Sequence, residues 1–361
     1  MTAPSLTRSP LTSERLHHAK HAYTTRHVDT LRSRGLLLEA TPAAGDLVLA
    51  QVDRIGQHKR LEDRHGRRAT LFPGDEVVVC YGARYAPDQF HAVVPEDLSA
   101  CHLVAAGGLA GQVQAAHSAM APPTSLLPLG ILLDGAGERI NLSQSAAPAG
   151  AVAGLPPTIA VVGSSMNSGK TTSAAHLIGG LRRAGLRVGA AKVTGTGAGG
   201  DVWLMQDAGA AVVLDFTSAG VPSTYRMGPD EVLRVFRTLL YQLSTAGCDV
   251  LVIEVADGIY HAETSALVSS PDFATAVDAV LYAAGDAAGA VTGATWLAGR
   301  QLPVLGVTGL LSASPLAAEE ARGLVDHPVL SLADLGDPVQ ALALQQQVAG
   351  GREGSFPCPS R

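Results

Sequence analysis

The residues whose types and spacing point most directly to chemistry lie between Thr158 and Thr172. This stretch reads Thr-Ile-Ala-Val-Val-Gly-Ser-Ser-Met-Asn-Ser-Gly-Lys-Thr-Thr. Its two glycines let the backbone turn tightly, so that the N–H groups between them can point inward at a phosphate. Lys170 adds a positive charge, and Thr171 offers a hydroxyl to a magnesium ion. The stretch therefore predicts a phosphate-binding loop rather than an ordinary strand–turn–helix.

The sequence on either side of this loop supplies the elements that would position it. Residues 159–162 are apolar and mostly β-branched, as expected of a strand that is covered on both faces. A helix starting near Thr171 would direct its positive end at the same phosphate. Five residues separate Gly163 from Gly169, where the commonest pattern has four. The predicted nucleotide-binding residues are Gly163, Ser164, Ser165, Met166, Asn167, Ser168, Gly169, Lys170, Thr171 and Thr172.

Three charged residues follow other predicted strands and would join the site. Glu254 ends an apolar strand and could hold magnesium directly or through water; otherwise it is a solvated strand-end carboxylate. Lys192 could neutralise a transferring phosphoryl group or an anionic substrate, or be a surface residue at a strand end. Asp201 opens a helix after a glycine loop. It fits a metal ligand and an N-cap equally well.

His261 is a candidate catalytic residue because it follows Glu254 by seven residues, beyond the end of the same strand. Gly258 would let the intervening loop turn back toward the phosphate loop. An imidazole at that place could act as general base on a substrate amine or hydroxyl. The alternative is a loop histidine whose ring is satisfied by a backbone group.

The second half of the chain, residues 158–345, alternates strands and helices. This alternation predicts an α/β fold with a doubly wound, mostly parallel sheet, whose site lies beyond the carboxyl ends of the strands. We expect strands at 159–162, 188–193, 211–215, 249–255, 279–283 and 303–308. We expect helices at 170–184, 201–208, 229–246, 286–299 and 315–323.

The first half of the chain has a different sequence pattern. Residues 36–142 form short segments separated by turn signals and predict a small β-barrel or β-sandwich domain, with strands at 46–52, 68–72, 76–81, 89–94 and 102–106. Arg84 and Tyr85 could contact a ligand, but exposed loop residues are the simpler interpretation. Residues 143–157 have the composition of a linker. Residues 346–361 are expected to be a mobile tail.

Residues 1–35 are polar and are expected to be a mobile N-terminal segment with a short helix. His17, His18, His21 and His27 raise the idea of a metal site. A solvated helix is favoured because no carboxylate or cysteine joins them in a ligand pattern.

Composition narrows the function classes. The chain has 361 residues, a net charge of −6 and 16% charged residues without a long Lys/Arg run, so nucleic acid is an improbable partner. Four scattered cysteines suggest neither a zinc site nor a disulfide framework. The N-terminus lacks an apolar signal core and no run could span a bilayer, so we expect a cytoplasmic protein with no membrane association.

The motifs together resemble those of dethiobiotin synthetase. The resemblance covers the loop from Gly163 to Thr171 with its five-residue spacing, Ala191-Lys192-Val-Thr-Gly, Asp201-Val-Trp-Leu-Met-Gln206 and Val252-Ile-Glu254. It implies that Thr171, Asp201 and Glu254 hold Mg²⁺, and that Lys170 and Lys192 contact phosphate or carbamate. It also implies a homodimer.

After Glu254 the chain looks closer to the P-loop family that contains D-amino-acid N-acyltransferases. That family has a glutamate, a glycine and a histidine spaced like Glu254, Gly258 and His261. Dethiobiotin synthetase has an aspartate at the place of Ser165 and a glycine-rich substrate loop after the glutamate. No Asn-Lys-x-Asp guanine signature appears, which favours ATP over GTP.

The expected function is that of a Mg-ATP-dependent enzyme. It would activate a small carboxylate or carbamate by phosphoryl transfer, or couple ATP to acyl or amide-bond chemistry, with a small molecule as substrate. Two alternatives remain open at this point. One is a regulatory or chaperone-type NTPase whose β domain binds a partner, and the other is a polynucleotide 5′-kinase, which the negative charge disfavours.

Overall fold

The computed structural model describes residues 7–152 and 154–353 and divides the chain into two compact units. Unit 2 comprises Pro148–Gly195, Asp201–Asp215 and Met227–Arg361 and contains the predicted phosphate-binding loop. Its six strands are all parallel, in the order β14-β13-β15-β12-β16-β17. The α/β prediction is confirmed. The strands are β12 (Thr158–Gly163), β13 (Val188–Lys192), β14 (Val212–Asp215), β15 (Val250–Glu254), β16 (Ala279–Ala283) and β17 (Val304–Thr308).

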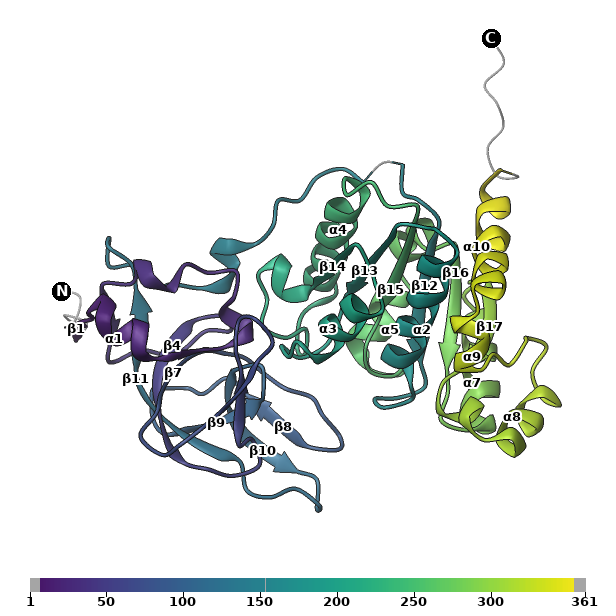
Figure 1. Cartoon of the computed structure of the whole chain (residues 1–361). Coiled ribbons are helices and arrows are strands. Elements are labelled where there is room, and N and C mark those ends of the chain that lie inside the picture. The colour runs from purple at the N-terminus through teal and green to yellow at the C-terminus, as the bar shows by residue number, and fades with distance from the viewer. Residues whose placement is uncertain (1–6, 153, 354–361) are drawn as a thin grey trace, which may run out of the picture. The chain divides into compact units, whose positions relative to one another are not determined.

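Helices cover both faces of this sheet (Figure 1). Along β12, Ile159 and Val161 face a core shared with α2 and the C-terminal helices, while the alternate residues face the other side. On that other side α4 contacts β13 and β14, and α7 contacts β16 and β17. The helices are α2 (Lys170–Arg183), α3 (Gly200–Asp207), α4 (Pro229–Ser244), α5 (Ala262–Val268), α6 (Pro271–Ala276), α7 (Ala287–Ala298), α8 (Pro315–Arg322), α9 (Leu332–Gly336) and α10 (Pro338–Glu353), with a 3₁₀ turn η5 (Leu310–Ala313).

Unit 1 comprises Met1–Ala147, Thr196–Gly200 and Phe216–Arg226 and is built around a closed barrel. Strand β11 pairs with β4, β4 with β7, β7 with β10, β10 with β9, and β9 returns to β11. The β-barrel alternative is therefore the one observed. The strands of the unit are β1 (Arg8–Pro10), β2 (Lys20–His21), β3 (Gly35–Leu37), β4 (Leu47–Arg54), β5 (Arg60–Glu62), β6 (Arg68–Thr70), β7 (Glu76–Tyr81), β8 (Phe90–Val93), β9 (Cys101–Ala105), β10 (Leu109–Ala116) and β11 (Thr124–Leu133).

Residues 7–35 cover the outside of this barrel, which corrects the expectation of a mobile segment there; residues 1–6 of the predicted segment lie outside the described ones. Leu16 is fully buried in one core cluster with Leu47 and Leu49 of β4, while Val48 belongs to the second cluster. Because successive residues of a strand point to opposite sides, β4 is buried on both. The covering elements are β1, α1 (Ser13–His18), β2, η1 (Tyr23–Thr25), η2 (Thr30–Arg32) and β3.

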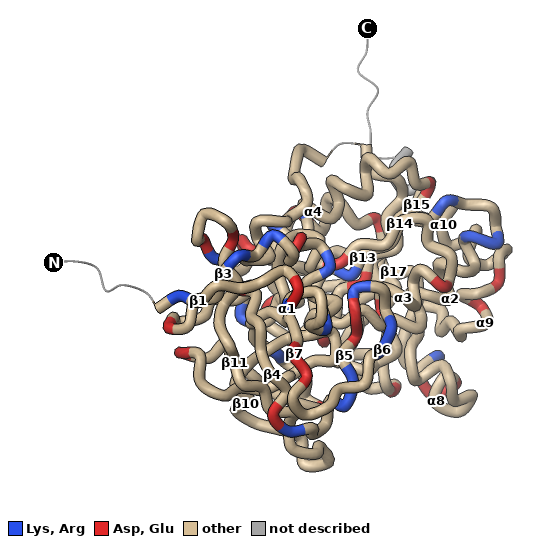
Figure 2. The backbone as a smooth tube through the Cα atoms, turned by 60° about the vertical axis from the view of Figure 1, so that its left-hand side comes forward, with Lys and Arg blue, Asp and Glu red and all other residues tan. Residues whose placement is uncertain are grey.

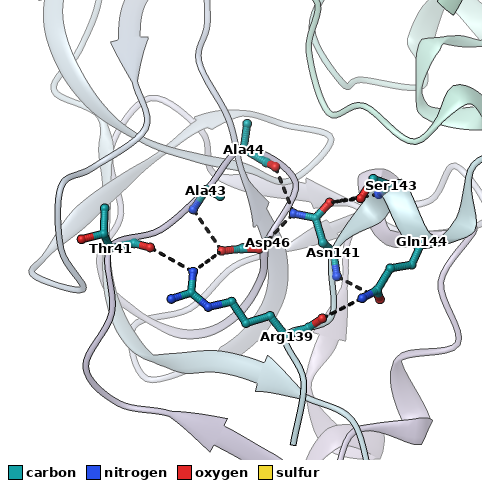
Figure 3. A network of polar contacts seen from close by, with 8 residues as sticks. All are labelled: Thr41, Ala43, Ala44, Asp46, Arg139, Asn141, Ser143 and Gln144. Carbon is teal, nitrogen blue, oxygen red and sulfur yellow. Dashed lines mark hydrogen bonds and ion pairs between the residues drawn. The ribbon is translucent and has the colours of Figure 1, made fainter. Parts of the chain in front are cut away.

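A polar network fastens the start of β4 to the end of the barrel domain (Figure 3). The buried carboxylate of Asp46 accepts from Arg139 Nη1 at 3.2 Å and from Asn141 Nδ2 at 2.9 Å. Asn141 Oδ1 also accepts from the Ser143 N–H, which caps η3 (Leu142–Ser145). The first turn of the predicted linker 143–157 is thus an ordered part of unit 1.

Two segments that lie within the second half of the sequence belong to unit 1. Thr196 pairs with Ser223 in an isolated bridge, and Gly197 donates its N–H to the Pro222 carbonyl at 2.9 Å. Glu62 Oε2 accepts the Gly199 N–H at 2.8 Å. The loops after β13 and β14 are therefore structural parts of the barrel unit, and the chain passes between the units five times. The second of these segments contains η4 (Phe216–Ala219).

The predicted tail, the cysteines and the charges complete the comparison with the sequence. Helix α10 continues to Glu353 and buries Val348, so the first residues of the predicted 346–361 tail are helical, and residues 354–361 lie outside the described ones. Cys80, Cys101 and Cys248 are free thiols. No helix in the described ranges has the length and apolar character needed to cross a membrane. Basic and acidic residues are interspersed along the chain (Figure 2).

Candidate functional site

The predicted phosphate-binding loop joins β12 to α2 as expected. Gly169 has φ +97° and Asn167 has φ +63°, so the loop passes twice through the left-handed region before the helix begins at Lys170. A Cβ at Gly163 would lie 2.4 Å from Ser168 Oγ and 2.8 Å from the Ala283 carbonyl oxygen. Both glycines are required by the geometry, Gly169 by its φ and Gly163 by lack of space.

The loop is supported by the ends of the two neighbouring strands. Ser164 donates its N–H to the Ala283 carbonyl at 2.9 Å, at the end of β16. Leu310, just after β17, donates its N–H to the Ser168 carbonyl at 3.0 Å. The sequence did not identify the loop after β17 as part of the site. Gly309 was the available signal, because glycine favours the positive φ of +96° that this residue adopts. These contacts support the shape of the loop.

Lys170 is 5% exposed, and its amino group donates to the Ser165 carbonyl of its own loop at 2.7 Å. Burial lowers the pKa of Lys170 to about 8, against the opposing effect of the carboxylates of Glu254 and Asp257. The Ser165 carbonyl and these carboxylates therefore compensate the buried ammonium only in part. An anion above the loop would restore its charge.

Thr171 and Glu254 meet as the magnesium prediction requires. Thr171 Oγ1 donates to Glu254 Oε1 at 2.9 Å, and Glu254 is 1% exposed. Two adjacent ligands of an octahedral Mg²⁺ at about 2.1 Å lie about 3 Å apart, so this hydroxyl and carboxylate oxygen fit neighbouring positions. Glu254 Oε2 is buried and has no hydrogen-bond partner among the described residues. Burial raises the pKa of Glu254, although Lys192 opposes the shift.

Lys192 and Asp201 form an ion pair beside this group. Lys192 Nζ also lies 3.9 Å from Glu254 Oε1. Burial opposes the charged form of Lys192, but these two carboxylates outweigh it and the pKa of Lys192 is raised. Helix α3 begins at Gly200, so Asp201 lies inside its first turn rather than at the N-cap position. The structure thus brings the lysine and both carboxylates together, with Asp201 held by the lysine.

We expect Asp201→Asn to weaken Mg²⁺-dependent ATP binding by about tenfold or more if the carboxylate ligates the metal with Glu254. Thermal stability should change little, because the Asp201 side chain is 36% exposed and such ion pairs contribute up to about 1 kcal/mol. Mg²⁺ titrations monitored by ATP binding, with Asp207→Asn at the exposed end of α3 as the control, check this. Unchanged Mg²⁺ affinity would mean that Asp201 pairs with Lys192 and does not bind the metal.

The loop after β15 turns back onto the phosphate loop, as the glycine at 258 predicted. Ile259 donates its N–H to the Gly163 carbonyl at 3.0 Å, and a Cβ at Gly258 would lie 2.4 Å from the Ser164 carbonyl oxygen. His261 ends this loop at the N-cap position of α5. Its Nδ1 lies 3.0 Å from Glu263 Oε2, so a carboxylate, rather than a backbone group, faces that nitrogen.

Asp257 is a member of this site that the sequence did not reveal. Burial raises its pKa, while His261, Lys170 and Lys192 oppose the shift electrostatically. Its φ is +63°, which is uncommon for a residue other than glycine and marks a restrained loop. The only sequence signal was its place before Gly258, which is weak because Asp-Gly pairs are common in turns.

The other residues that the sequence suggested as ligand contacts, the N-terminal histidines and Arg84, have less support as members of the phosphate-binding site. His21 is half-buried and contacts the Leu16 carbonyl and Thr30 Oγ1, which leaves no reason for a metal there. Within residues 7–152 and 154–353, no three His, Cys, Asp or Glu side chains gather to hold a metal ion. A magnesium site would rest on Thr171 and Glu254, with phosphates and waters completing the shell. Arg84, expected to be exposed, is 7% exposed.

A cavity of about 1320 Å³ opens at the other edge of the sheet, near the amino ends of β16 and β17. Its lining includes Phe236, Leu240 and the paired side chains of Arg237 and Asp272. Both charges are already compensated there. The phosphate-binding groups are all at the opposite edge, which is therefore the candidate site.

Comparisons with known proteins give little further guidance. No protein-family model matches the chain, and no curated protein matches it. Among solved structures, the signal recognition particle 54 kDa protein of Aeropyrum pernix K1, in complex with GDP, matches at 18% identity and TM-score 0.35, over 55% of this chain and 50% of that one. The septum site-determining protein MinD of Pyrococcus horikoshii OT3, complexed with Mg-ADP, matches at 12% identity and TM-score 0.35, over 56% of this chain and 100% of that one.

Similarity this low carries no conclusion about function. The fold assignment rests on the parallel sheet order and on the glycine-bounded loop between β12 and α2. Both are those of a P-loop NTPase fold.

Proposed function

We propose that the chain is a Mg-ATP-dependent enzyme that activates a small carboxylate or carbamate by phosphoryl transfer, or couples ATP to acyl or amide-bond formation. The observation that carries this proposal is the convergence of Lys170, Lys192 and the Thr171–Glu254 pair at one edge of the sheet. Two lysines and a carboxylate–hydroxyl pair are what a polyphosphate with a metal ion needs.

The residues of the site have separable roles in this proposal. The loop N–H groups and Lys170 would bind the β- and γ-phosphates, while Thr171 and Glu254 would hold Mg²⁺. Bound Mg²⁺ would neutralise charge on the phosphates. Lys192 would stabilise the anionic acceptor, and Asp201 would hold Lys192 in place and join Thr171 and Glu254 at the metal.

His261 favours an enzyme over a regulatory NTPase. A nucleotide switch has no need of an imidazole beside two carboxylates, whereas proton transfer from a substrate uses such a group. A substrate-independent hydrolysis stimulated by a protein would support the regulatory alternative instead. RNA phosphorylation would support a polynucleotide kinase, which the interspersed charges of the chain disfavour (Figure 2).

The buried state of Lys170 provides the test of nucleotide binding. With a pKa of about 8, Lys170 is about half deprotonated near pH 8. A polyphosphate would return it to the charged form, so Mg-ATP binding should take up about half a proton near pH 8, more at pH 8.5 and less at pH 7.5. The measurement is calorimetry in buffers of low and high ionisation enthalpy, in which uptake makes the observed enthalpy more positive in the second.

Lys170→Arg is the matched control, because arginine stays protonated throughout this range. The control should bind Mg-ATP without proton uptake. Parent protein that binds Mg-ATP with the same enthalpy in both buffers at pH 8.5 would contradict the role given to Lys170.

A further inference from the structure

Arg84 is a buried cation of the barrel unit that the proposed function does not use. Its backbone pairs with Ala92 in an isolated antiparallel bridge, with N–H···O contacts of 2.9 and 3.0 Å, at the base of the hairpin loop that leads into β8. The side chain is 7% exposed, and its Nη2 donates to Gln89 Oε1 at 2.9 Å across this loop. Nε and Nη1 are also buried, and neither has a hydrogen-bond partner among the described residues.

The charge of this guanidinium is compensated only in part. Asp88 acts on it electrostatically and favours the charged form, but it accepts no hydrogen bond from Nε or Nη1. Burial outweighs this effect and lowers the pKa of Arg84 to about 10. Buried charged groups in proteins are normally both paired and hydrogen-bonded, because desolvation is otherwise costly. Arg84 therefore offers a positive charge and two donor nitrogens to a further partner.

His58 is the neighbouring polar group. Phe90 and Ala92 are two residues apart in sequence, so the side chain of Phe90 lies on the same side of the hairpin as that of Arg84, the bridge partner of Ala92. The His58 ring centroid lies 5.8 Å from that of Phe90, and within residues 7–152 and 154–353 its buried Nδ1 has no hydrogen-bond partner.

The His58 ring is neutral near pH 7. Burial lowers its pKa to about 4, and the charge of Arg84 acts in the same direction. A neutral imidazole can donate a hydrogen bond to a ligand through Nδ1 when that nitrogen carries the proton. Arg84 is then the charged member of the pair and His58 the uncharged one.

We propose that Arg84 anchors a binding site for one small oxyanion, a carboxylate or a phosphate, with Nδ1 of His58 beside it. A guanidinium forms strong charge-assisted hydrogen bonds with the oxygen atoms of both ions. Because the three nitrogens are enclosed by protein, the ligand must be small. The site belongs to unit 1 and goes beyond the proposed function, which uses only residues of unit 2.

Ordered water is the alternative partner, because buried waters commonly satisfy polar groups that the protein leaves without a hydrogen bond. Water would complete the hydrogen bonds of Nε and Nη1, but it would not compensate the charge of Arg84. An oxyanion supplies both the acceptor oxygens and the opposite charge. A second alternative is that Arg84 acts only as a tether of the hairpin through Gln89. Neither alternative predicts a site that saturates with an added anion.

The test is a ¹³C-detected correlation of the arginine Nε and Cζ signals in the full-length protein, with the Arg84 signal assigned through its own side-chain carbons. Sodium acetate and sodium phosphate are added in separate titrations, at an ionic strength held constant with sodium chloride. We expect the Arg84 signal to shift and to saturate with at least one of them, with half-saturation at about 10 mM or lower. The salt that saturates at the lower concentration identifies the preferred ion as a carboxylate or a phosphate.

Arg67, an exposed arginine of the same unit, is the internal control, and its signal should not saturate. His58→Phe keeps an aromatic ring beside Phe90 but removes Nδ1, so the half-saturation concentration should rise several-fold. Far-UV circular dichroism confirms that the variant folds. An Arg84 signal that fails to saturate with either salt would overturn the proposal, and so would an unchanged half-saturation in a folded His58→Phe variant.

A second variant separates this site from the phosphate loop. In Lys170→Ala the phosphate loop lacks its lysine, whereas Arg84 and His58 are unaltered. The half-saturation of the Arg84 signal should therefore be the same in Lys170→Ala as in the parent protein. A large increase in Lys170→Ala would mean that the signal reports phosphate bound at the loop, which would overturn a separate site at Arg84. The titrations need no nucleotide, so their outcome is independent of whether Mg-ATP binds.

Discussion

Lys170→Ala should lose tight Mg-ATP binding, by roughly 100-fold or more, while the protein keeps its fold. A hydrogen bond from a charged group is worth up to about 3 kcal/mol, and about 1.4 kcal/mol corresponds to a factor of ten. Among the described residues, this amino group donates one hydrogen bond, to the Ser165 carbonyl of its own loop. Removing a poorly compensated buried charge should therefore cost little stability. Calorimetric titration with Mg-ATP, together with thermal unfolding, measures both effects.

Lys59→Ala removes an exposed lysine of the barrel unit and should leave Mg-ATP affinity unchanged. Equal affinity in Lys170→Ala and the parent protein would refute the phosphate-loop assignment. A loss of affinity that comes with a large fall in unfolding temperature would instead mean that Lys170 supports the fold.

Gly258→Ala should reduce Mg-ATP affinity by about tenfold or more and lower the unfolding temperature. A Cβ at this place would lie 2.4 Å from the Ser164 carbonyl oxygen and 3.1 Å from Ser165 Cα, which are backbone atoms of the phosphate loop. Neither can move aside as a flexible side chain could, so the two loops must separate. Overpacking of this kind typically costs about 1–3 kcal/mol. Calorimetry and thermal unfolding are again the measurements.

Gly285→Ala is a sensitive control, since Gly285 follows β16 at the same edge of the sheet and a Cβ there meets no atom within 4 Å. Any general effect of adding a methyl group near the site should appear in both variants. Equal affinities for Gly258→Ala and Gly285→Ala would show that the contact with Ser164 does not support the loop.

The sequence was informative where local chemistry decides the structure. The phosphate loop needs glycine where φ is positive or space is lacking, and it needs a lysine and a threonine at fixed places, so its residues could be read directly. Strand ends such as Glu254 followed from apolar runs of the length of a strand. The helix after the loop was predicted to within one residue of its observed end at Arg183.

Features that depend on distant packing were not predicted. Leu16 and Tyr23 are the only large apolar side chains between residues 12 and 27, and their burial depends on the outer face of the barrel, which the sequence does not display. Strand β11 contains Pro128 and Gly130, which weaken its strand pattern although register shifts accommodate both. Asp257 matters through burial and the nearby lysines, which are properties of the folded chain.

The two short segments that unit 1 takes from the second half of the sequence have a consequence for synthesis. The barrel unit lacks its last segment until Arg226 has been made, and unit 2 still lacks three of its six strands at that moment. Neither unit can therefore be completed on the ribosome before synthesis of the other has begun. Cutting the gene after the codon for Ala147 would separate the barrel strands from Thr196–Gly200 and Phe216–Arg226, to which they are bonded. Each half of the sequence therefore lacks segments that its own unit needs, and the two are expected to fold only as parts of one chain.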